Sequence, residues 1–366
     1  MNTISLCMIV RNEQATIARC LDSVRSAVDE IVIVDTGSKD ATLEIVAAYT
    51  DKMIHFPWID DFAAARNESF RHASCDYILW LDADDVMAPE DAAALRELKQ
   101  WLDPSVDSVT MPYLLSFDEQ GNAVHSLRRN RLVKRARQFR WIGCVHEYLE
   151  VSGNIQHSGI AVRHQPVERP GRSGRNLAIY ERKLTSDQPF NPRDRYYYAN
   201  ELKDHGRWEQ AAEQYELFLS EGLGWEEDCI QACGKLADCY HELRQPDRFA
   251  DSALRSFRYG APRAEMCCRL GYHFLEGGRL DAAVFWYGTA AQLERPASRW
   301  AILNEACWTW LPHLQLCVCY DRLGEYARAY EHNKQALAYL PEDPRMLANQ
   351  AYLEGRLKSV IPAKKD

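Results

Sequence analysis

Short apolar runs alternate with amphipathic segments over the first part of the chain. The apolar runs predict strands at 4–10, 30–35, 53–56 and 77–81. The segments between them repeat apolar residues at helical spacing and predict helices at 13–27, 39–49 and 62–72. Strands that alternate with helices of this length indicate βαβ units, and therefore an α/β fold with a mostly parallel sheet.

Polar clusters follow three of these predicted strands, at 11–13, 35–38 and 82–85. Right-handed crossovers bring the carboxyl ends of parallel strands to one edge of the sheet, where open α/β folds bind their ligands. Independent helix caps would not need to share an edge. We therefore expect the three clusters to form one site.

The last cluster places Asp82, Asp84 and Asp85 within four positions. Carboxylates this close repel one another unless a cation or a hydrogen-bond donor lies among them. Such a site suits Mg²⁺ or Mn²⁺, which bridge substrate phosphates. The alternative is local structure, with Asp82 in a turn and Asp85 as a helix cap. The shared edge favours Asp84 as a metal ligand. Asp85 is either a helix cap or a residue that supports the metal site.

The other two clusters fit a nucleotide site. Asp35 ends a strand as the ribose-binding acid of dinucleotide folds does, and Gly37 with Ser38 supplies a tight turn. No Gly-x-Gly-x-x-Gly follows the first strand and no P-loop motif is present, which excludes those two classes. Arg66 and Asn67 add a cation and an amide near the same edge, unless Arg66 forms a surface salt bridge.

The pattern changes after a helix predicted at 89–102. Alternation over 106–117 predicts a strand, and 118–122 a hairpin turn. The following stretch is basic. It forms either a positive wall that faces a diphosphate or an anionic acceptor, or the solvated face of a hairpin. Its members are Arg128, Arg129, Arg131, Lys134, Arg135, Arg137 and Arg140.

An acceptor site is predicted where Trp141, His146 and Glu147 lie close in sequence. Transfer of a group to a hydroxyl or similar acceptor needs a side chain that takes the acceptor proton. Glu147 is the first candidate for this base, Asp118 the second and His146 the third, while Trp141 offers an aromatic platform. The alternative for Glu147 is an ion pair with a nearby arginine.

From residue 176 onward the pattern is helical and repeats itself. The phrase around Gly206 returns around Gly278 and again around Gly324, and 233–249 fits a degenerate copy. Gly206 and Gly278 lie about two periods of ~34 residues apart, which resembles a tetratricopeptide array. Stacked helical pairs leave a concave face that grips peptides or another subunit, or they act as a rigid buttress. An insertion is expected at 294–305.

A segment rich in Pro, Gly and charge at 168–175 marks a domain boundary or a mobile loop. We therefore expect an α/β domain over 1–168, a linker with a first helix over 169–190, and all-α repeats over 191–366.

Composition narrows the partners and the compartment. The 366 residues are 46% hydrophobic and 27% charged, as in globular proteins, and the formal charge of −9 argues against nucleic acid. No apolar run approaches the ~20 residues that span a bilayer, and the start lacks signal-peptide features. Twelve cysteines lie among apolar positions without metal-ligand spacing, which favours core packing. Free cysteines in turn indicate a reducing cytoplasm. The alternative is a peripheral location at the inner face of the membrane.

Four ordered motifs, at 5–13, 31–40, 61–67 and 80–84, resemble family 2 glycosyltransferases of the GT-A fold. The resemblance covers the first half of the chain. It implies a Rossmann-like domain that transfers a sugar from a UDP-sugar with inversion, using Mn²⁺ or Mg²⁺. Relatives also carry a similar Trp-x-Gly-x-Val-His-Glu segment, and they often show Asp-x-Asp-Glu where this chain ends in Asp85.

The resemblance also implies roles for single residues. Asp35 would contact the uridine, and the Asp-x-Asp pair the ribose and the metal-bound diphosphate. A late histidine often completes the metal shell, so His164 is either a ligand or a structural residue. The implied metal set is Asp82, Asp84 and His164. The implied donor set is Val10, Arg11, Asn12, Glu13, Asp35, Gly37, Ser38, Arg66, Asn67, Asp82 and Ala83.

The acceptor stays open between two enzymatic interpretations. A repeat array fused to such an enzyme suggests a peptide or protein acceptor, as in family 2 enzymes that glycosylate bacteriocin peptides on Ser or Cys. The rival acceptor is a cell-envelope saccharide or a lipid-linked one. The non-enzymatic alternative is a repeat scaffold with an inactive nucleotide-binding domain, against which Asp82 and Asp84 speak. The repeats also offer a surface for a homodimer.

Overall fold

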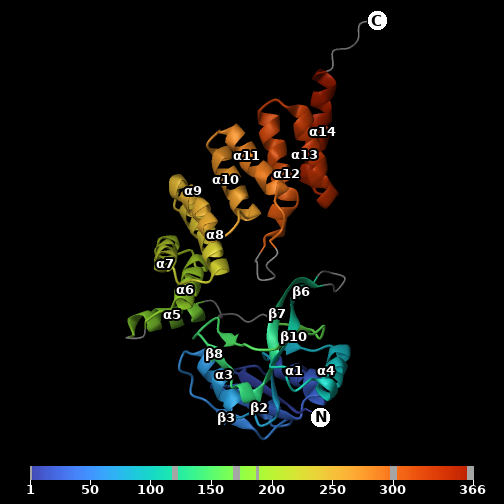
Figure 1. The fold of residues 1–366 in the computed structure, drawn as a ribbon, viewed down its shortest axis with the longest axis vertical. Coiled ribbons are helices and arrows are strands. Elements are labelled where there is room, and N and C mark those ends of the chain that lie inside the picture. Colours follow the sequence, from blue (N-terminus) through green and yellow to red (C-terminus); the bar gives the residue numbers. More distant parts are fainter. Residues whose placement is uncertain (1, 118–122, 168–173, 187–188, 297–302, 361–366) are drawn as a thin grey trace. The chain divides into compact units, whose positions relative to one another are not determined.

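A computed structural model of the protein describes residues 2–117, 123–167, 174–186, 189–296 and 303–360. The chain divides into two compact units, Met1–Asp187 and Gln188–Asp366 (Figure 1). The predicted hairpin turn at 118–122, most of the predicted loop at 168–175 and part of the insertion at 294–305 lie outside the described residues.

The first unit is built on a mixed sheet. Its strands are β1 (Ile4–Val10), β2 (Glu30–Asp35), β3 (Met53–His55), β4 (Tyr77–Trp80), β5 (Asp85–Val86), β6 (Ser108–Phe117), β7 (Ala123–Lys134), β10 (Ile155–His157) and β11 (Val162–His164). Their order is β3-β2-β1-β4-β7-β6-β11-β5, with β10 beside β6. β1 to β4 run parallel, whereas β7 is antiparallel to both of its neighbours. This arrangement confirms the predicted α/β class.

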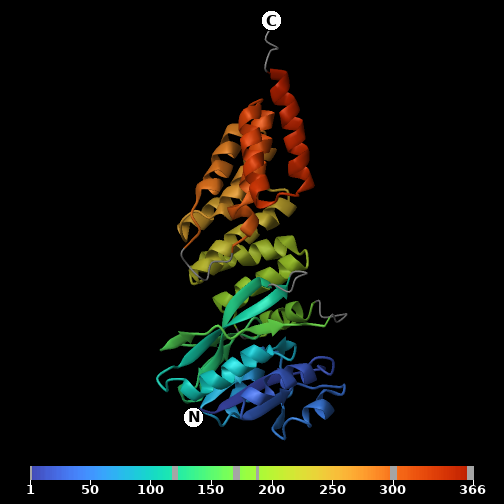
Figure 2. The ribbon, with the colours of Figure 1, turned by 90° about the vertical axis from the view of Figure 1, so that its right-hand side faces the viewer.

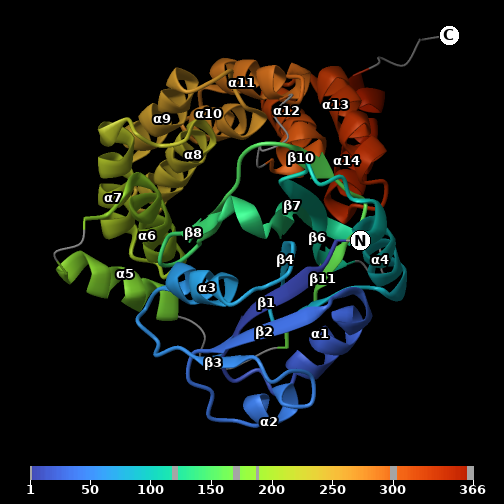
Figure 3. The same ribbon diagram turned by 60° about the horizontal axis from the view of Figure 1, so that its bottom comes forward.

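Helices and a small ribbon cover the two faces of the sheet. The elements are α1 (Ile17–Val24), η1 (Arg25–Ala27), α2 (Thr42–Val46), α3 (Phe62–Arg71), α4 (Pro89–Trp101), η2 (Arg135–Arg137), β8 (Arg140–Ile142), β9 (Tyr148–Glu150) and α5 (Arg175–Thr185). α1 and α4 contribute to the core on one face, and α3 with β8–β9 to the core on the other. Figure 3 shows α1 and α3 on opposite sides of β1 and β2.

Each central strand buries both of its faces. In β4, Tyr77 and Leu79 belong to the core beneath α1 and α4, whereas Ile78 and Trp80 belong to the core beneath α3. Successive side chains of a strand point to opposite faces, so a strand covered on both sides is apolar throughout. This is why the strands appear in the sequence as continuous apolar runs.

Strand register brings the predicted polar clusters to one edge. Val10 at the end of β1 pairs with Asp35 at the end of β2, and Cys7 pairs with Trp80. The chain that continues beyond Trp80 therefore reaches the end of β1. We call this place, formed by residues 11–13, 35–38 and 82–85, the polar edge.

Two helices next to the polar edge are shorter than predicted. α1 begins at Ile17 rather than 13, and α2 spans only Thr42–Val46 of the predicted 39–49. The amides of the intervening residues bond across the two loops instead, Lys39 N to Asn12 Oδ1 at 2.8 Å and Gln14 N to Asp40 Oδ2 at 3.2 Å. Side chains that offer the backbone another partner compete with helix formation.

The second unit consists of stacked helical pairs. They are α6 (Pro192–Asp204) with α7 (Trp208–Glu221), α8 (Glu226–Glu242) with α9 (Pro246–Arg255) and η3 (Ser256–Arg258), α10 (Ala264–Glu276) with α11 (Leu280–Gln292), and η4 (Glu305–Trp308), α12 (Trp310–Arg322) with α13 (Tyr326–Tyr339), followed by α14 (Pro344–Val360). Figure 2 shows them as successive layers, and in Figure 3 α6 to α14 follow an arc. The predicted repeats are confirmed.

One turn recurs between the two helices of each pair. Gly206, Gly278 and Gly324 have φ of 70°, 70° and 79°, and the next helix begins two residues later each time. Arg244 takes the corresponding place before α9 with φ of 56°. Glycine adopts this left-handed conformation without steric cost, whereas a side chain makes it unfavourable. The repeat at 233–249 therefore departs from the others at its turn, where arginine replaces glycine.

All twelve cysteines are free thiols, and all except the half-buried Cys75 are buried. This placement agrees with core packing. None of the helices in the described part of the chain is long and apolar enough to cross a membrane.

Candidate functional site

The carboxylates that follow β4 point to three different partners. Asp82 binds Arg66, Asp84 faces His164, and Asp85 binds Arg131. The cluster that looks uniform in sequence is therefore divided into three separate interactions.

Arg66 on α3 joins Asp82 to Glu147. Its Nη2 lies 2.7 Å from Asp82 Oδ1, and its Nε lies 2.6 Å from Glu147 Oε1. The guanidinium also lies over the rings of Trp80 and Trp141, 5.1 Å and 4.8 Å from their centroids. Burial opposes the charge, but Asp82 and Glu147 outweigh it and raise the pKa of Arg66.

The same interaction acts on Asp82. Burial alone would raise the pKa of the Asp82 carboxyl, but the charges of Arg66 and Arg131 hold it below its usual value. Arg66, predicted to contact the donor, thus holds Asp82 in the polar edge and brings Glu147 to it. The predicted ion pair between Glu147 and an arginine is present.

Asn67 fixes the position of Trp141. Its Nδ2 donates to the Trp141 carbonyl at 2.9 Å, and its Oδ1 accepts from the Trp141 amide at 2.8 Å. Asn67, which was predicted to bind the donor, therefore binds the backbone of Trp141, which was predicted to bind the acceptor. Since Trp141 stacks on Arg66, Asn67 also supports Arg66 from the next position of α3.

Asp85 lies in the core and is not a helix cap. Its Oδ2 is 3.0 Å from Arg131 Nη1, and both side chains are fully buried. It also accepts from the Asp82 amide at 2.9 Å and from the Tyr113 hydroxyl at 2.8 Å. α4 begins only at Pro89. The helix-cap interpretation of Asp85 is therefore wrong, and the supporting role stays a prediction.

His164 reaches the polar edge through strand pairing. β11 and β5 are antiparallel, with His164 opposite Asp85. The His164 Nδ1 atom lies 3.6 Å from Asp84 Oδ1 and 3.6 Å from Asp85 Oδ1. The nearby Asp85 carboxylate raises the pKa of His164 despite partial burial, and burial raises the pKa of Asp84 despite the opposing effect of His164.

Asp84, Asp85 and His164 form a group of potential metal ligands within the part of the chain that the structure describes. One ligand atom of each lies within 4.8 Å of the others. Two carboxylates and an imidazole are a donor set that suits Mn²⁺ better than Mg²⁺. Because both Asp85 oxygens already accept hydrogen bonds, Asp84 and His164 are the members with coordination capacity to spare.

Hydrogen bonds within and between the two loops stabilise the remaining part of the polar edge. Asp35 accepts hydrogen bonds from the amides of Gly37 at 3.0 Å and Ser38 at 3.1 Å. The Asn12 amide donates to Ser38 Oγ at 3.0 Å, and the Glu13 amide to Thr42 at 2.7 Å. Gly37, with φ of 101°, needs the freedom of glycine for this turn. These contacts give the loop a defined shape before any ligand binds.

The other predicted site residues differ in accessibility. Val10 and Ala83 are buried, so the backbone is what they offer a ligand, whereas Arg11 and His146 are exposed. His146 has φ of 53° in the turn before β9. Asp118, the second candidate base, lies outside the described residues.

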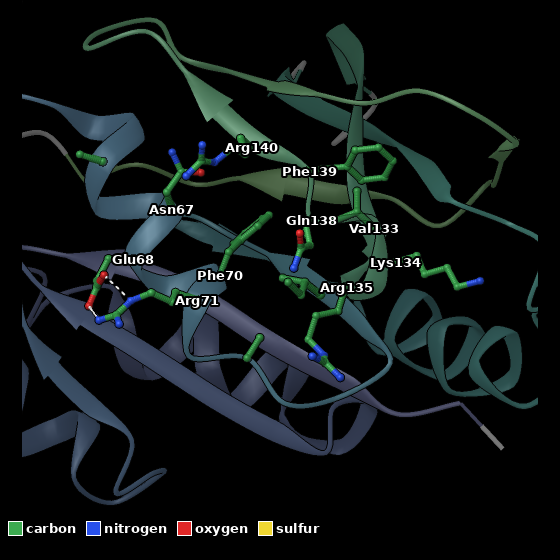
Figure 4. A pocket seen from close by; sticks show the side chains of 13 residues that line it. Asn67, Glu68, Phe70, Arg71, Val133, Lys134, Arg135, Gln138, Phe139 and Arg140 are labelled. Atoms are coloured by element: carbon green, nitrogen blue, oxygen red, sulfur yellow. Dashed lines mark hydrogen bonds and ion pairs between the residues drawn. The ribbon is translucent and has the colours of Figure 1, made fainter.

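The basic stretch is divided between several places. Arg131 is buried against Asp85, and Arg128 Nη1 donates to the Ser158 carbonyl at 3.0 Å. Lys134, Arg135 and Arg140 line a groove of about 700 Å³ between α3 and residues 133–140, near the start of β4 and away from Asp82. Figure 4 shows Phe70, Val133 and Phe139 in this groove, with Glu68 paired to Arg71. These five basic side chains, among the residues that the structure describes, therefore do not share one surface.

Tyr113 and Trp80 belong to the site but were not singled out from the sequence. Tyr113 contacts Asp85 and His164, and the Trp80 ring lies against both Arg66 and Arg131. The alternation of apolar and polar residues places Tyr113 on one face of its strand, but it does not show which residues that face contacts.

Similarity to known proteins agrees with this geometry. The family model described as Glycosyl transferase family 2 matches residues 5–153. A "TPR repeat-containing protein" of Synechococcus elongatus is 30% identical over 349 residues, which cover 93% of this chain and 76% of that protein.

Two relatives with glycosyltransferase names match shorter parts. The SPbeta prophage-derived glycosyltransferase SunS of Bacillus subtilis is 28% identical over 55% of this chain and 49% of its own length. The lipopolysaccharide core biosynthesis glycosyltransferase LpsC of Rhizobium meliloti is 29% identical over 42% of this chain and 58% of its own length. The matches thus span only about half of each of these two relatives. The chain carries a domain of glycosyl transferase family 2 over residues 5–153, followed by a C-terminal array of tetratricopeptide repeats.

Proposed function

We propose that the protein is a metal-dependent, inverting glycosyltransferase that moves a sugar from a UDP-sugar to a peptide or protein side chain. The observation that carries the proposal is the pair of Asp84 and His164 at the carboxyl edge of a family 2 domain. A divalent metal held there would neutralise the departing diphosphate. Free thiols throughout fit a location in the reducing cytoplasm.

The residues around this pair have distinct roles in the proposal. Asp35 and the turn at Gly37 and Ser38 bind the nucleoside, and Asp82, held by Arg66, binds the ribose or waters of the metal. The acceptor atom attacks the anomeric carbon as the bond from that carbon to the diphosphate oxygen breaks. Trp141, fixed by Asn67, provides a platform for the acceptor.

Glu147 is the proposed general base that takes the acceptor proton. Its carboxylate is brought to the polar edge by Arg66 and is only 12% exposed. A base that works by this route has to exchange its hydrogen bond with Arg66 for one with the acceptor. Asp118 and His146 are the alternatives, in that order.

The acceptor class is proposed from the repeats. A concave helical array fused to the transferase suits an extended peptide or a protein partner. A cell-envelope acceptor is the second candidate, which the match to LpsC favours. The same repeats provide a surface for a homodimer.

The experiment incubates the purified full-length protein and Mn²⁺ with a panel of UDP-sugars, and measures both UDP release and sugar-mass adducts on peptides. We expect metal-dependent UDP release that is lost in Asp84→Ala. The proposal is wrong if no UDP-sugar binds or is hydrolysed with Mn²⁺ present. Adducts on lipid or saccharide acceptors with none on peptides would select the second candidate.

A further inference from the structure

The Tyr113 hydroxyl lies between Asp85 and His164, and the proposed function gives it no role. Its oxygen is 2.8 Å from Asp85 Oδ1 and 2.9 Å from His164 Nδ1. The Tyr113 side chain is buried on β6, and its ring meets the His164 ring edge-on, with centroids 5.7 Å apart. This one hydroxyl therefore contacts both a carboxylate and an imidazole of the metal group.

The direction of these two hydrogen bonds follows from Asp85. Asp85 Oδ2 is occupied by Arg131 and by the Asp82 amide, which marks the group as a carboxylate that only accepts. A phenol has one proton, so Tyr113 donates that proton to Asp85 Oδ1. Toward His164, the Tyr113 oxygen can then only accept, and His164 Nδ1 must carry a hydrogen.

A neutral imidazole with its hydrogen on Nδ1 has a lone pair on Nε2. We propose that Tyr113 is a positioning residue that fixes His164 in the Nδ1–H tautomer, which leaves Nε2 as the ring nitrogen with a lone pair for a divalent metal. The inference rests on the proposed function, because that function supplies the metal. It adds a support of the kind that metal-binding histidines use, in which the second ring nitrogen donates to a fixed acceptor.

Asp85 cannot fix the tautomer without Tyr113. The distance of 3.6 Å from Asp85 Oδ1 to His164 Nδ1 is longer than a hydrogen bond. The four groups thus form one chain from Arg131 through Asp85 and Tyr113 to His164.

The substitution Tyr113→Phe removes the hydroxyl and keeps the ring. The ring also lies 4.4 Å from the Arg131 guanidinium, a contact that phenylalanine preserves. Tyr49→Phe is the matched control, because it removes a tyrosine hydroxyl that binds Asp22 at 2.9 Å in the same unit but outside the site.

Two measurements on the full-length protein test the inference. The first is the dissociation constant for Mn²⁺ alone, where we expect about 10-fold or greater weakening in Tyr113→Phe and no change in Tyr49→Phe. The second is the ¹⁵N spectrum of histidine-labelled protein, with His164 assigned by its absence in His164→Gln. At a pH where the ring is neutral, we expect the Nδ1–H form for His164 in the native protein and a mixture of both tautomers in Tyr113→Phe.

The outcomes separate the inference from the proposed function. A native protein that binds no Mn²⁺ contradicts the proposed function, while its ¹⁵N spectrum still decides the tautomer. Unchanged Mn²⁺ affinity in Tyr113→Phe, or an Nε2–H form of His164 in the native protein, overturns the inference. Should Tyr113→Phe fail to fold by circular dichroism, the spectrum of the native protein alone is decisive.

Discussion

Arg131 and Asp85 form an ion pair with 3.0 Å between Nη1 and Oδ2, and neither side chain is exposed. Taking two charges out of water is costly, and the cost is offset only if both stay paired and hydrogen-bonded. The Arg131 guanidinium also stacks on Trp80, 3.9 Å from the ring centroid. The support of the proposed metal site therefore depends on an interaction buried in the core.

Removing Arg131 is expected to destabilise the first unit strongly. Arg131→Met leaves the Asp85 charge buried without its partner, which costs about 3–5 kcal/mol in the free energy of unfolding. Urea unfolding followed by tryptophan fluorescence measures this loss. Arg140→Met, at an exposed position of the same unit, is the control and should change stability by less than ~0.5 kcal/mol. Equal effects of the two substitutions would contradict the assignment.

Asp84 is expected to be essential for the reaction but not for folding. Asp84→Asn removes a charged ligand of the proposed metal, and a loss of ~3 kcal/mol of transition-state stabilisation lowers kcat about 100-fold. Calorimetry with Mn²⁺ and the rate of UDP release measure binding and turnover separately. Asp51→Asn, at an exposed position of the same unit, should leave both unchanged. Full activity of Asp84→Asn without metal would refute metal dependence.

Glu147→Gln tests the general base. The amide keeps the size of the side chain but cannot take a proton, so transfer should fall by about 10²–10⁴-fold while the affinity for the UDP-sugar stays within a few fold. Glu150→Gln, at an exposed position of β9, serves as the control. Undiminished transfer by Glu147→Gln would redirect the search to Asp118 and His146.

Arg244 offers a stabilising substitution in the repeats. Its φ of 56° is a conformation that costs a side chain about 1–2 kcal/mol and costs glycine nothing. The greater freedom of glycine in the unfolded chain offsets part of this gain. Arg244→Gly should therefore raise the free energy of unfolding by about 1 kcal/mol, and the Tm of the second unit by about 2–4 °C. The reverse test is Gly206→Ala, where φ is 70° and the Tm should fall. Scanning calorimetry distinguishes the two directions.

His332 makes the second unit sensitive to acid. Burial and the adjacent His313 lower the pKa of His332 to about 4, against 6.5 in the unfolded chain. Between these values the unfolded chain binds a proton that the folded one does not, so stability is complete above about pH 6.5 and falls as the pH drops to about 4. Because the ring is partly exposed, we expect a loss of about 1–2 kcal/mol.

The measurement is the free energy of unfolding of the second unit at several pH values. His332→Gln should flatten the slope between about pH 6.5 and pH 4, and His205→Gln, at an exposed position, should not. A slope of the opposite sign would show that His332 is stabilised in its charged form.

The sequence by itself determined what depends on local pattern. Continuous apolar runs identified strands that are buried on both faces, and the ends of β1 and β2 agree with the predicted 4–10 and 30–35. The repeated phrase around Gly206 and Gly278 identified the helical array, because each turn needs a positive φ. The polar edge was also predictable, since parallel strands end on one side of a sheet.

Tertiary structure alone decided which partner each polar residue has. Arg131 reaches Asp85 because β7 lies next to β4, and His164 reaches it because β11 pairs with β5. Glu147 meets Arg66 across a separation of 81 residues. Strand order sets such contacts, and neither hydrophobic periodicity nor motif spacing encodes strand order. The sequence therefore predicted where the polar residues gather, and the packing of the sheet decided which carboxylate is buried, which is paired and which faces the histidine.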